Sequence, residues 1–116
     1  YILMVFQTQQ SAYESSLSFV NFLRDRKNES NLPFELIGAV PVLIKRSGKV
    51  DEKILNMSKT AFSQALFENQ IYQRERIKKF GAEGIRNKDM HDKKVIHMFN
   101  KVYIELVDRI QVIESE

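Results

Sequence analysis

The segment Ile2–Phe6 constrains the fold most, because five apolar residues follow one another without a polar residue between them. A continuous run of this kind is typical of a strand that is covered on both faces, as in a parallel sheet. Parallel strands also need helices that connect them and cover the faces of the sheet. The start of the chain therefore predicts an α/β unit. Because the chain begins at Tyr1 directly in this pattern, we expect it to be an excerpt of a longer protein.

Strand-like and helix-like segments alternate along the rest of the chain. A helix is expected from Ser11, which forms a predicted capping box with Glu14. The next apolar segment, Phe34–Val40, predicts a strand that ends near Pro41, because proline donates no ladder hydrogen bond. A helix over 51–64, a short strand over 66–71, a basic helix over 74–80 and a long helix from Asp92 complete the order. The last helix is expected to carry one apolar stripe, which consists of Val95, Phe99, Val102, Leu106, Ile110 and Ile113. We therefore expect a three-layer α/β domain over residues 1–116, with a parallel sheet and right-handed crossover helices.

Composition excludes several kinds of site. The chain has 116 residues and no cysteine, which excludes disulfides, iron–sulfur clusters and thiolate zinc sites and fits a reducing cytoplasm. His91 and His97 are six positions apart, a spacing that does not place two imidazoles on one helical face. No apolar run approaches the roughly 18 residues of a membrane helix. We predict neither a metal site nor a membrane partner.

Basic residues concentrate between Arg74 and Lys94. This stretch holds eight Lys or Arg residues against four acids, and it accounts for the whole formal net charge of +3. A local concentration of positive charge is typical of a surface that binds a polyanion. An ordinary solvated surface has the same appearance, so both interpretations stay open.

Ligands of parallel sheets bind beyond the carboxyl ends of the strands. The loops at 7–10, 44–49 and 72–74 are therefore expected on the functional edge. A phosphate loop of the form GxxxxGK[ST] is absent from the sequence, since none of the four glycines has that context. No catalytic residue is assigned.

Several segments carry a resemblance to a known family. They are the strand, polar loop and helix start at Ile2–Glu14, the strands Phe34–Val40 and Leu66–Ile71, and the basic segment Arg74–Ile77 with Gly84-Ile85. In this order they resemble the second half of ParA/MinD-type partition ATPases. The closing segment, Asp92-Lys93-Lys94-Val95 followed by Phe99, Val102, Tyr103 and Glu105-Leu106, is similar to the last helix of the small plasmid partition ATPases of Gram-positive bacteria.

The resemblance implies part of a P-loop NTPase-like fold, whose N-terminal half with the phosphate loop and catalytic aspartates is missing here. The parent protein would be a nucleoid-associated DNA-segregation ATPase that uses ATP and Mg, forms a homodimer and has a centromere-binding partner protein. This portion alone would bind neither cofactor and would be inactive. In the family, the loop after the third of these strands lines the adenine, which implies Tyr72 and Gln73. A loop glutamate that reaches the other subunit's nucleotide in some members is replaced here by Gln9.

The resemblance also implies that this half contacts DNA without sequence preference. The matching positions are Arg76 and Lys93, with Arg74, Lys78, Lys79 and Lys94 nearby. An alternative interpretation is a non-catalytic α/β interaction or regulatory module whose basic face binds an acidic protein. Binding of random duplex DNA with a steep salt dependence would separate the two.

Overall fold

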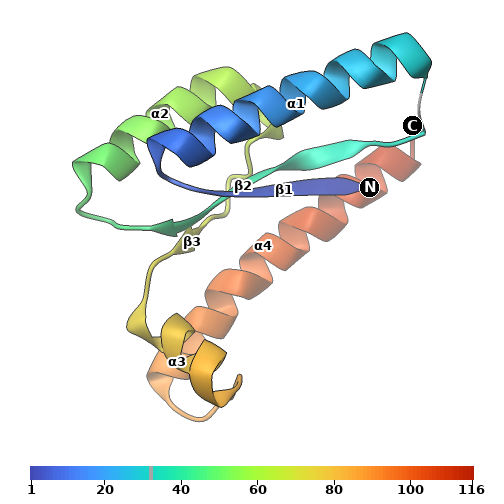
Figure 1. The fold of residues 1–116 in the computed structure, drawn as a ribbon. Coiled ribbons are helices and arrows are strands. Elements are labelled where there is room, and N and C mark those ends of the chain that lie inside the picture. Colours follow the sequence, from blue (N-terminus) through green and yellow to red (C-terminus); the bar gives the residue numbers. More distant parts are fainter. Residues whose placement is uncertain (32) are drawn as a thin grey trace.

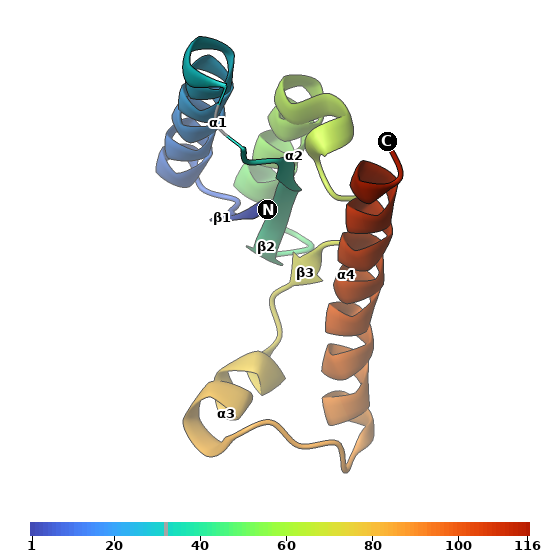
Figure 2. The ribbon, with the colours of Figure 1, turned by 90° about the vertical axis from the view of Figure 1, so that its right-hand side faces the viewer.

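A computed structural model describes residues 1–31 and 33–116, and it contains a parallel sheet with helices on both faces (Figure 1). The central strand β2 (Leu36–Ile44) lies between β1 (Ile2–Gln7) and β3 (Ile71–Tyr72). Helices α1 (Gln10–Ser30) and α2 (Lys49–Phe62) cover one face, and α4 (Met90–Glu114) covers the other (Figure 2). The prediction of an α/β unit with a parallel sheet is confirmed.

Two helical segments complete the chain. The short 3-10 helix η1 (Ser63–Ala65) follows α2 directly, and α3 (Glu75–Glu83) stands beyond the edge of the sheet, close to the start of α4 (Figure 2). Among the described residues, no helix is long and apolar enough to cross a membrane.

Each face of the sheet buries its own apolar core. On the α1–α2 side, Met4 and Phe6 of β1 pack with Ala39 of β2 and with residues of the two helices, which are Tyr13, Val20, Ile54 and Phe62. On the α4 side, the buried residues Ile37, Val40 and Phe67 pack against Val102, Leu106, Ile110 and Ile113. This second core confirms the apolar stripe expected for the last helix at these four positions, whereas Phe99 of the same stripe is 47% exposed.

Strand β1 is covered fully on one face and only in part on the other, where Leu3 packs against the core on the α4 side, in contrast to the expectation from its apolar run. Met4 and Phe6 are buried, whereas the intervening Val5 is 57% exposed. The reason is the position of α4, which packs against β2 and β3.

Strand β2 continues past Pro41 to Ile44, so its predicted end is wrong. Pro41 pairs with Phe6 of β1, while the pairing with β3 begins only at Val42. Leu43 has a φ of 55°, and the register shifts between Val42 and Ile44. Proline lacks only the backbone N–H donor, and it is tolerated in a strand where the hydrogen-bond ladder is irregular or interrupted.

The third strand lies later than predicted. Leu66 forms only an isolated bridge with Ala39, and the regular strand is confined to Ile71–Tyr72. Leu66 and Phe67 are buried in the core, so their apolar character reflects packing rather than a strand. Apolar runs of this length do not distinguish the two cases.

Helix ends also differ from the expectations. Helix α1 starts at Gln10, which places Ser11 inside its first turn, and the N-cap residue Gln9 makes no side-chain cap bond. Helix α3 runs through Gly81 to Glu83 and ends at Gly84, whose φ of 96° suits glycine. Helix α4 starts at Met90, because Asp89 is the cap that precedes it.

Candidate functional site

Asp51 joins two loops at the carboxyl edge of the sheet. Its carboxylate accepts a hydrogen bond from Thr8 Oγ1 at 2.6 Å and one from the backbone N–H of Lys45 at 3.0 Å. The bond from Thr8, followed by that from Lys45, lowers the pKa of Asp51. The loops after β1 and β2 are thereby held together. Asp51 was not among the predicted site residues, and its only signal in the sequence is an acid in the first turn of a helix.

A groove of about 370 Å³ opens between β3 and α4, and we call it the β3–α4 groove. It is lined by Arg46, Tyr72, Arg74, Lys94, His97, Met98 and Lys101, with Glu68–Gln70 on one wall. The guanidinium carbon of Arg46 lies 4.1 Å from the ring centroid of Tyr72, a cation–π contact. The backbone N–H of Tyr72 points to Met98 Sδ at 3.1 Å. These contacts fix Tyr72 between the loop after β2 and α4.

Positive charge dominates the β3–α4 groove. Four of its side chains are cationic and a single one, Glu68, is a carboxylate. Arg46 comes from the loop after β2 and Arg74 is the N-cap of α3, while Lys94 and Lys101 lie seven positions apart on α4. Within residues 1–31 and 33–116, none of these four cations forms an ion pair.

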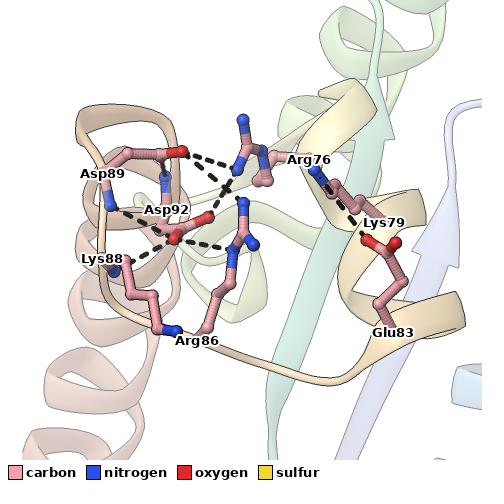
Figure 3. Close-up of polar contacts among 7 residues, drawn as sticks. All are labelled: Arg76, Lys79, Glu83, Arg86, Lys88, Asp89 and Asp92. Carbon is pink, nitrogen blue, oxygen red and sulfur yellow. Dashed lines mark hydrogen bonds and ion pairs between the residues drawn. The ribbon is translucent and has the colours of Figure 1, made fainter.

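A second polar cluster ties α3 to the start of α4 (Figure 3). We call it the α3–α4 clasp, and it consists of Arg76, Arg86, Asp89 and Asp92. Asp92 is fully buried and accepts hydrogen bonds from Arg76 at 2.8 Å and from Arg86 at 3.2 Å. Asp89 accepts from Arg76 at 2.9 Å and forms a reciprocal capping box with Asp92. The clasp therefore closes the loop between the two helices.

The pKa of Asp92 reflects two opposed effects. Burial raises it, but the backbone N–H groups of Lys88 and Asp89 and the charges of Arg76 and Arg86 favour the ionised form. The net result is a pKa below the ordinary value. Asp92 is thus a carboxylate that stays ionised inside the protein.

The structure divides the six residues predicted to contact DNA into two groups. Arg76 is engaged in the clasp, Lys78 lies 3.6 Å from Glu75, and Lys79 lies 3.9 Å from Glu83. These three side chains already have a carboxylate beside them.

The other three predicted DNA residues are Arg74, Lys93 and Lys94. Arg74 and Lys94 line the β3–α4 groove, and Lys93 is exposed in the first turn of α4. In the part of the chain that the structure describes, none of the three is in an ion pair. The charge available to a ligand therefore lies at the start of α4 and in the groove.

The residues predicted for the nucleotide lie on the same edge but not all together. Tyr72 lines the groove, and the next residue, Gln73, is exposed and donates its backbone N–H to the Ile44 carbonyl at 2.9 Å. Gln9 follows β1, on the far side of the central strand, and its side-chain amide donates to the Gln7 side chain at 3.3 Å. Gln9 thus does not line the β3–α4 groove.

Glu105 and Arg109 support the wall of the groove, and sequence reasoning missed this role. Glu105 accepts hydrogen bonds from the backbone N–H groups of Glu68 and Asn69 at 3.0 and 2.9 Å. Arg109 donates to the carbonyls of Ile37, Gln64 and Leu66, and its guanidinium carbon lies 4.3 Å from the Phe67 ring centroid. The available signal was an acid and a base four residues apart within an apolar helical stripe.

In residues 1–31 and 33–116, no group of three or more His, Asp or Glu side chains could hold a metal ion. No family model matches the chain, and no curated protein matches it at a significant level. Its function therefore has to follow from the geometry of the site.

Proposed function

We propose that this chain is the C-terminal, DNA-binding part of an ATP-dependent partition ATPase of the ParA/MinD type, with part of a P-loop NTPase-like fold. The observation that carries the DNA-binding part is a group of three cations around the start of α4, Arg74, Lys93 and Lys94, which form no ion pair with any described residue. The ATPase part rests on the sequence resemblance, with which the parallel α/β sheet is compatible.

Unpaired cations suit a phosphate backbone for a thermodynamic reason. A protein cation that replaces a counterion of DNA releases that ion, which favours binding at low salt. A lysine already beside a carboxylate has to lose that neighbour first. Lys93 also lies at the N-terminal end of α4, where the helix dipole disfavours a cation. Its position is therefore better explained by a ligand than by helix stability.

The nucleotide would need residues from outside this chain. Tyr72 offers a half-buried aromatic ring and Gln73 an exposed position after β3, which fit the base side of a pocket. The phosphates and Mg require the phosphate loop, whose sequence pattern this chain lacks. We therefore assign ATP and Mg, together with the homodimer and the centromere-binding partner, to the whole protein.

Two double variants test the proposed DNA binding. Lys93→Ala/Lys94→Ala removes two unpaired cations, and Lys78→Ala/Lys79→Ala removes two paired ones with the same change in net charge. Anisotropy of a labelled random duplex should show weaker binding for the first variant, with a log–log salt slope flatter by about two units. The second variant should bind nearly as the wild type does. Absence of duplex binding by the wild type would overturn the proposal.

One observation favours the alternative of a protein partner. An apolar groove of about 330 Å³ lies between α3 and α4 and is lined by Ile77, Phe80, Ile85 and Phe99, among others. Ile85 is 80% exposed and Phe99 is 47% exposed. An acidic peptide with apolar anchors could contact both this groove and the basic residues beside it. Such binding would persist at salt concentrations that release DNA, because apolar burial is not screened.

A further inference from the structure

We infer that the apolar groove between α3 and α4 is a docking site for an acidic, amphipathic segment of a partner protein. The apolar side chains of that segment enter the groove, and its carboxylates meet lysines on the rim. We call this hollow the apolar groove, and it is lined by Ile77, Phe80, Ile85, Val95, Ile96 and Phe99, among others. The inference goes beyond the proposed DNA binding and does not depend on it.

The lining of the apolar groove suits apolar side chains. Its volume is about 330 Å³, and Asn100 contributes the one polar side chain among the described residues that line it. Val95 is buried, whereas Ile85 and Phe99 are exposed. Side chains that enter the groove therefore remove apolar surface of both partners from water, which favours binding.

The walls of the apolar groove are held in place before a partner arrives. Each of the three segments that form the walls supplies one member of the α3–α4 clasp, namely Arg76 of α3, Arg86 of the loop and Asp92 of α4 (Figure 3). Asp92 accepts hydrogen bonds from Arg76 at 2.8 Å and from Arg86 at 3.2 Å. A site whose walls are already ordered loses less conformational entropy on binding.

The charge around the apolar groove favours an acidic partner. Each of the four carboxylates in the stretch 74–94 already has a cation beside it, and these carboxylates are Glu75, Glu83, Asp89 and Asp92. Four cations of the same stretch form no ion pair with any described residue, and they are Arg74, Lys88, Lys93 and Lys94. The charge left for an external partner is therefore positive, and its complement is negative.

Two of these four cations lie next to the apolar groove. Lys88 follows Ile85 by three residues in the loop, and Lys93 precedes Ile96 by three residues on α4. Residues three apart on a helix are neighbours on its surface. Lys88 and Lys93 are both exposed. A segment with apolar anchors flanked by carboxylates therefore matches the groove and its rim.

A protein segment fits these observations better than a nucleic acid or a membrane. A groove between helices is typical of sites that bind an amphipathic helix through apolar side chains at positions i, i+3 or i+4, and i+7. A nucleic acid backbone has no apolar side chains that could enter the groove. Insertion into a membrane needs an apolar face that protrudes from the protein, whereas Val95 lies buried in the lining of the hollow.

The test uses the full chain and three fluorescent helical peptides. The first has leucines at i, i+3, i+4 and i+7 and glutamates at the other positions. The second has lysines in place of the glutamates, and the third has serines in place of the leucines. Fluorescence anisotropy should show saturable binding of the first peptide, at least about tenfold tighter than that of either of the others.

Two pairs of variants locate the binding. Ile85→Ser/Phe99→Ser removes two exposed apolar side chains of the groove, and Phe22→Ser/Val50→Ser removes two exposed ones of α1 and α2. We expect the groove variant to bind the acidic leucine peptide at least about tenfold more weakly, and the control to change its affinity less than about twofold.

The second pair addresses the charge. Lys88→Ala/Lys93→Ala should weaken binding of the acidic leucine peptide by about threefold or more at low salt and make it less sensitive to salt. Lys53→Ala/Lys59→Ala, which removes two exposed lysines of α2, should bind that peptide as the wild type does.

A measurement on the wild type keeps the test independent of how the variants fold. Circular dichroism checks the fold of each variant. NMR spectra of the wild type should show amide shifts over 77–85 and 95–100 when the acidic leucine peptide is added, with α1 and α2 unchanged.

Several results would overturn the inference. These are equal affinity for the acidic and the basic peptide, amide shifts confined to α1 and α2, or no binding of any peptide. Binding to vesicles of phosphatidylglycerol and phosphatidylcholine without peptide binding would indicate a membrane surface instead. Self-association that Ile85→Ser/Phe99→Ser abolishes, without peptide binding, would indicate a second copy of the chain. In each case, binding of random duplex DNA still decides the proposed function separately.

Discussion

Nη1 of Arg76 lies 2.8 Å from Oδ1 of Asp92, a carboxylate without exposed surface, and this contact holds α3 against the first turn of α4. A buried carboxylate needs a counter-charge or hydrogen-bond donors, because it has lost its hydration. Arg76 therefore has a structural partner inside the protein. Any test of DNA binding that substitutes Arg76 would disturb the clasp as well as the surface charge.

Substitution of Arg76 by Ala should loosen α3. The variant leaves the buried Asp92 with fewer donors, which is destabilising. Amide hydrogen exchange should speed up over 75–83 and at the start of α4, while α1 and α2 stay protected. Lys79→Ala is the control, because its exposed pair with Glu83, at 3.9 Å, contributes little. Unchanged exchange in Arg76→Ala would show that the clasp does not hold α3.

The stability of the fold should fall at acid pH. The pKa values of Asp51, Asp89, Asp92 and Glu105 are all lowered in the folded chain. Their stabilisation is present above the unfolded pKa values of about 4 and is lost as the pH falls through the lower folded values. Urea unfolding at pH values between about 7 and 3 measures this loss.

Asp92→Asn isolates the contribution of the clasp to that pH dependence. This variant should be less stable than wild type at neutral pH, and its stability should decline less on acidification. Glu52→Gln is the matched control, because it neutralises one carboxylate at an exposed position of α2. If the stability of Asp92→Asn fell on acidification as steeply as that of the wild type, the clasp would not contribute to the pH dependence.

Arg109→Ala should lower the free energy of unfolding by about 2–3 kcal/mol, because it removes charged donors from several carbonyls. Arg109→Lys should recover only part of the lost stability, since an ammonium group cannot reproduce the planar guanidinium that lies over the Phe67 ring. Urea unfolding gives both values. Arg24→Ala, at an exposed position, should change stability by less than about 0.5 kcal/mol. A similarly small loss in Arg109→Ala would contradict the role of Arg109.

Gly38→Ala and Gly81→Ala should change stability in opposite directions. A Cβ on Gly38 would lie 2.5 Å from the Ala65 carbonyl oxygen and 2.8 Å from the Phe67 ring, so we expect a loss of about 1–3 kcal/mol. Gly81 lies inside α3 with nothing within 4 Å of its added Cβ, so alanine should stabilise that helix by about 0.5–1 kcal/mol. Thermal unfolding distinguishes the two. Equal effects would contradict the steric argument.

The chain alone should not hydrolyse ATP. Phosphoryl transfer needs groups that position the phosphates and neutralise their charge, and this sequence has no GxxxxGK[ST] segment. Phosphate release by the purified chain should equal that of a buffer blank. Turnover that is lost in a Tyr72→Ala variant would contradict the prediction.

Local patterns in the sequence determined the class of fold. The apolar segments at Ile2–Phe6 and Phe34–Val40, separated by helical periodicity, were enough to predict parallel strands joined by helices. The stripe through Val102, Leu106 and Ile110 likewise predicted a long helix packed on the sheet. The sequence predicts these features because the spacing of apolar residues and the helix propensity depend only on residues that are close together in the chain.

Tertiary structure alone decided which charges are available. Arg76 pairs with Asp92, sixteen residues later, while Arg46 and Lys101, more than fifty residues apart, meet at one groove. It also decided that β2 continues past Pro41, because the pairing with β3 begins only at Val42. Neither the number of charged residues nor the secondary-structure propensity of a segment predicts these pairings. The physical reason is that charge pairing and strand pairing depend on distances in space, which the packed fold sets.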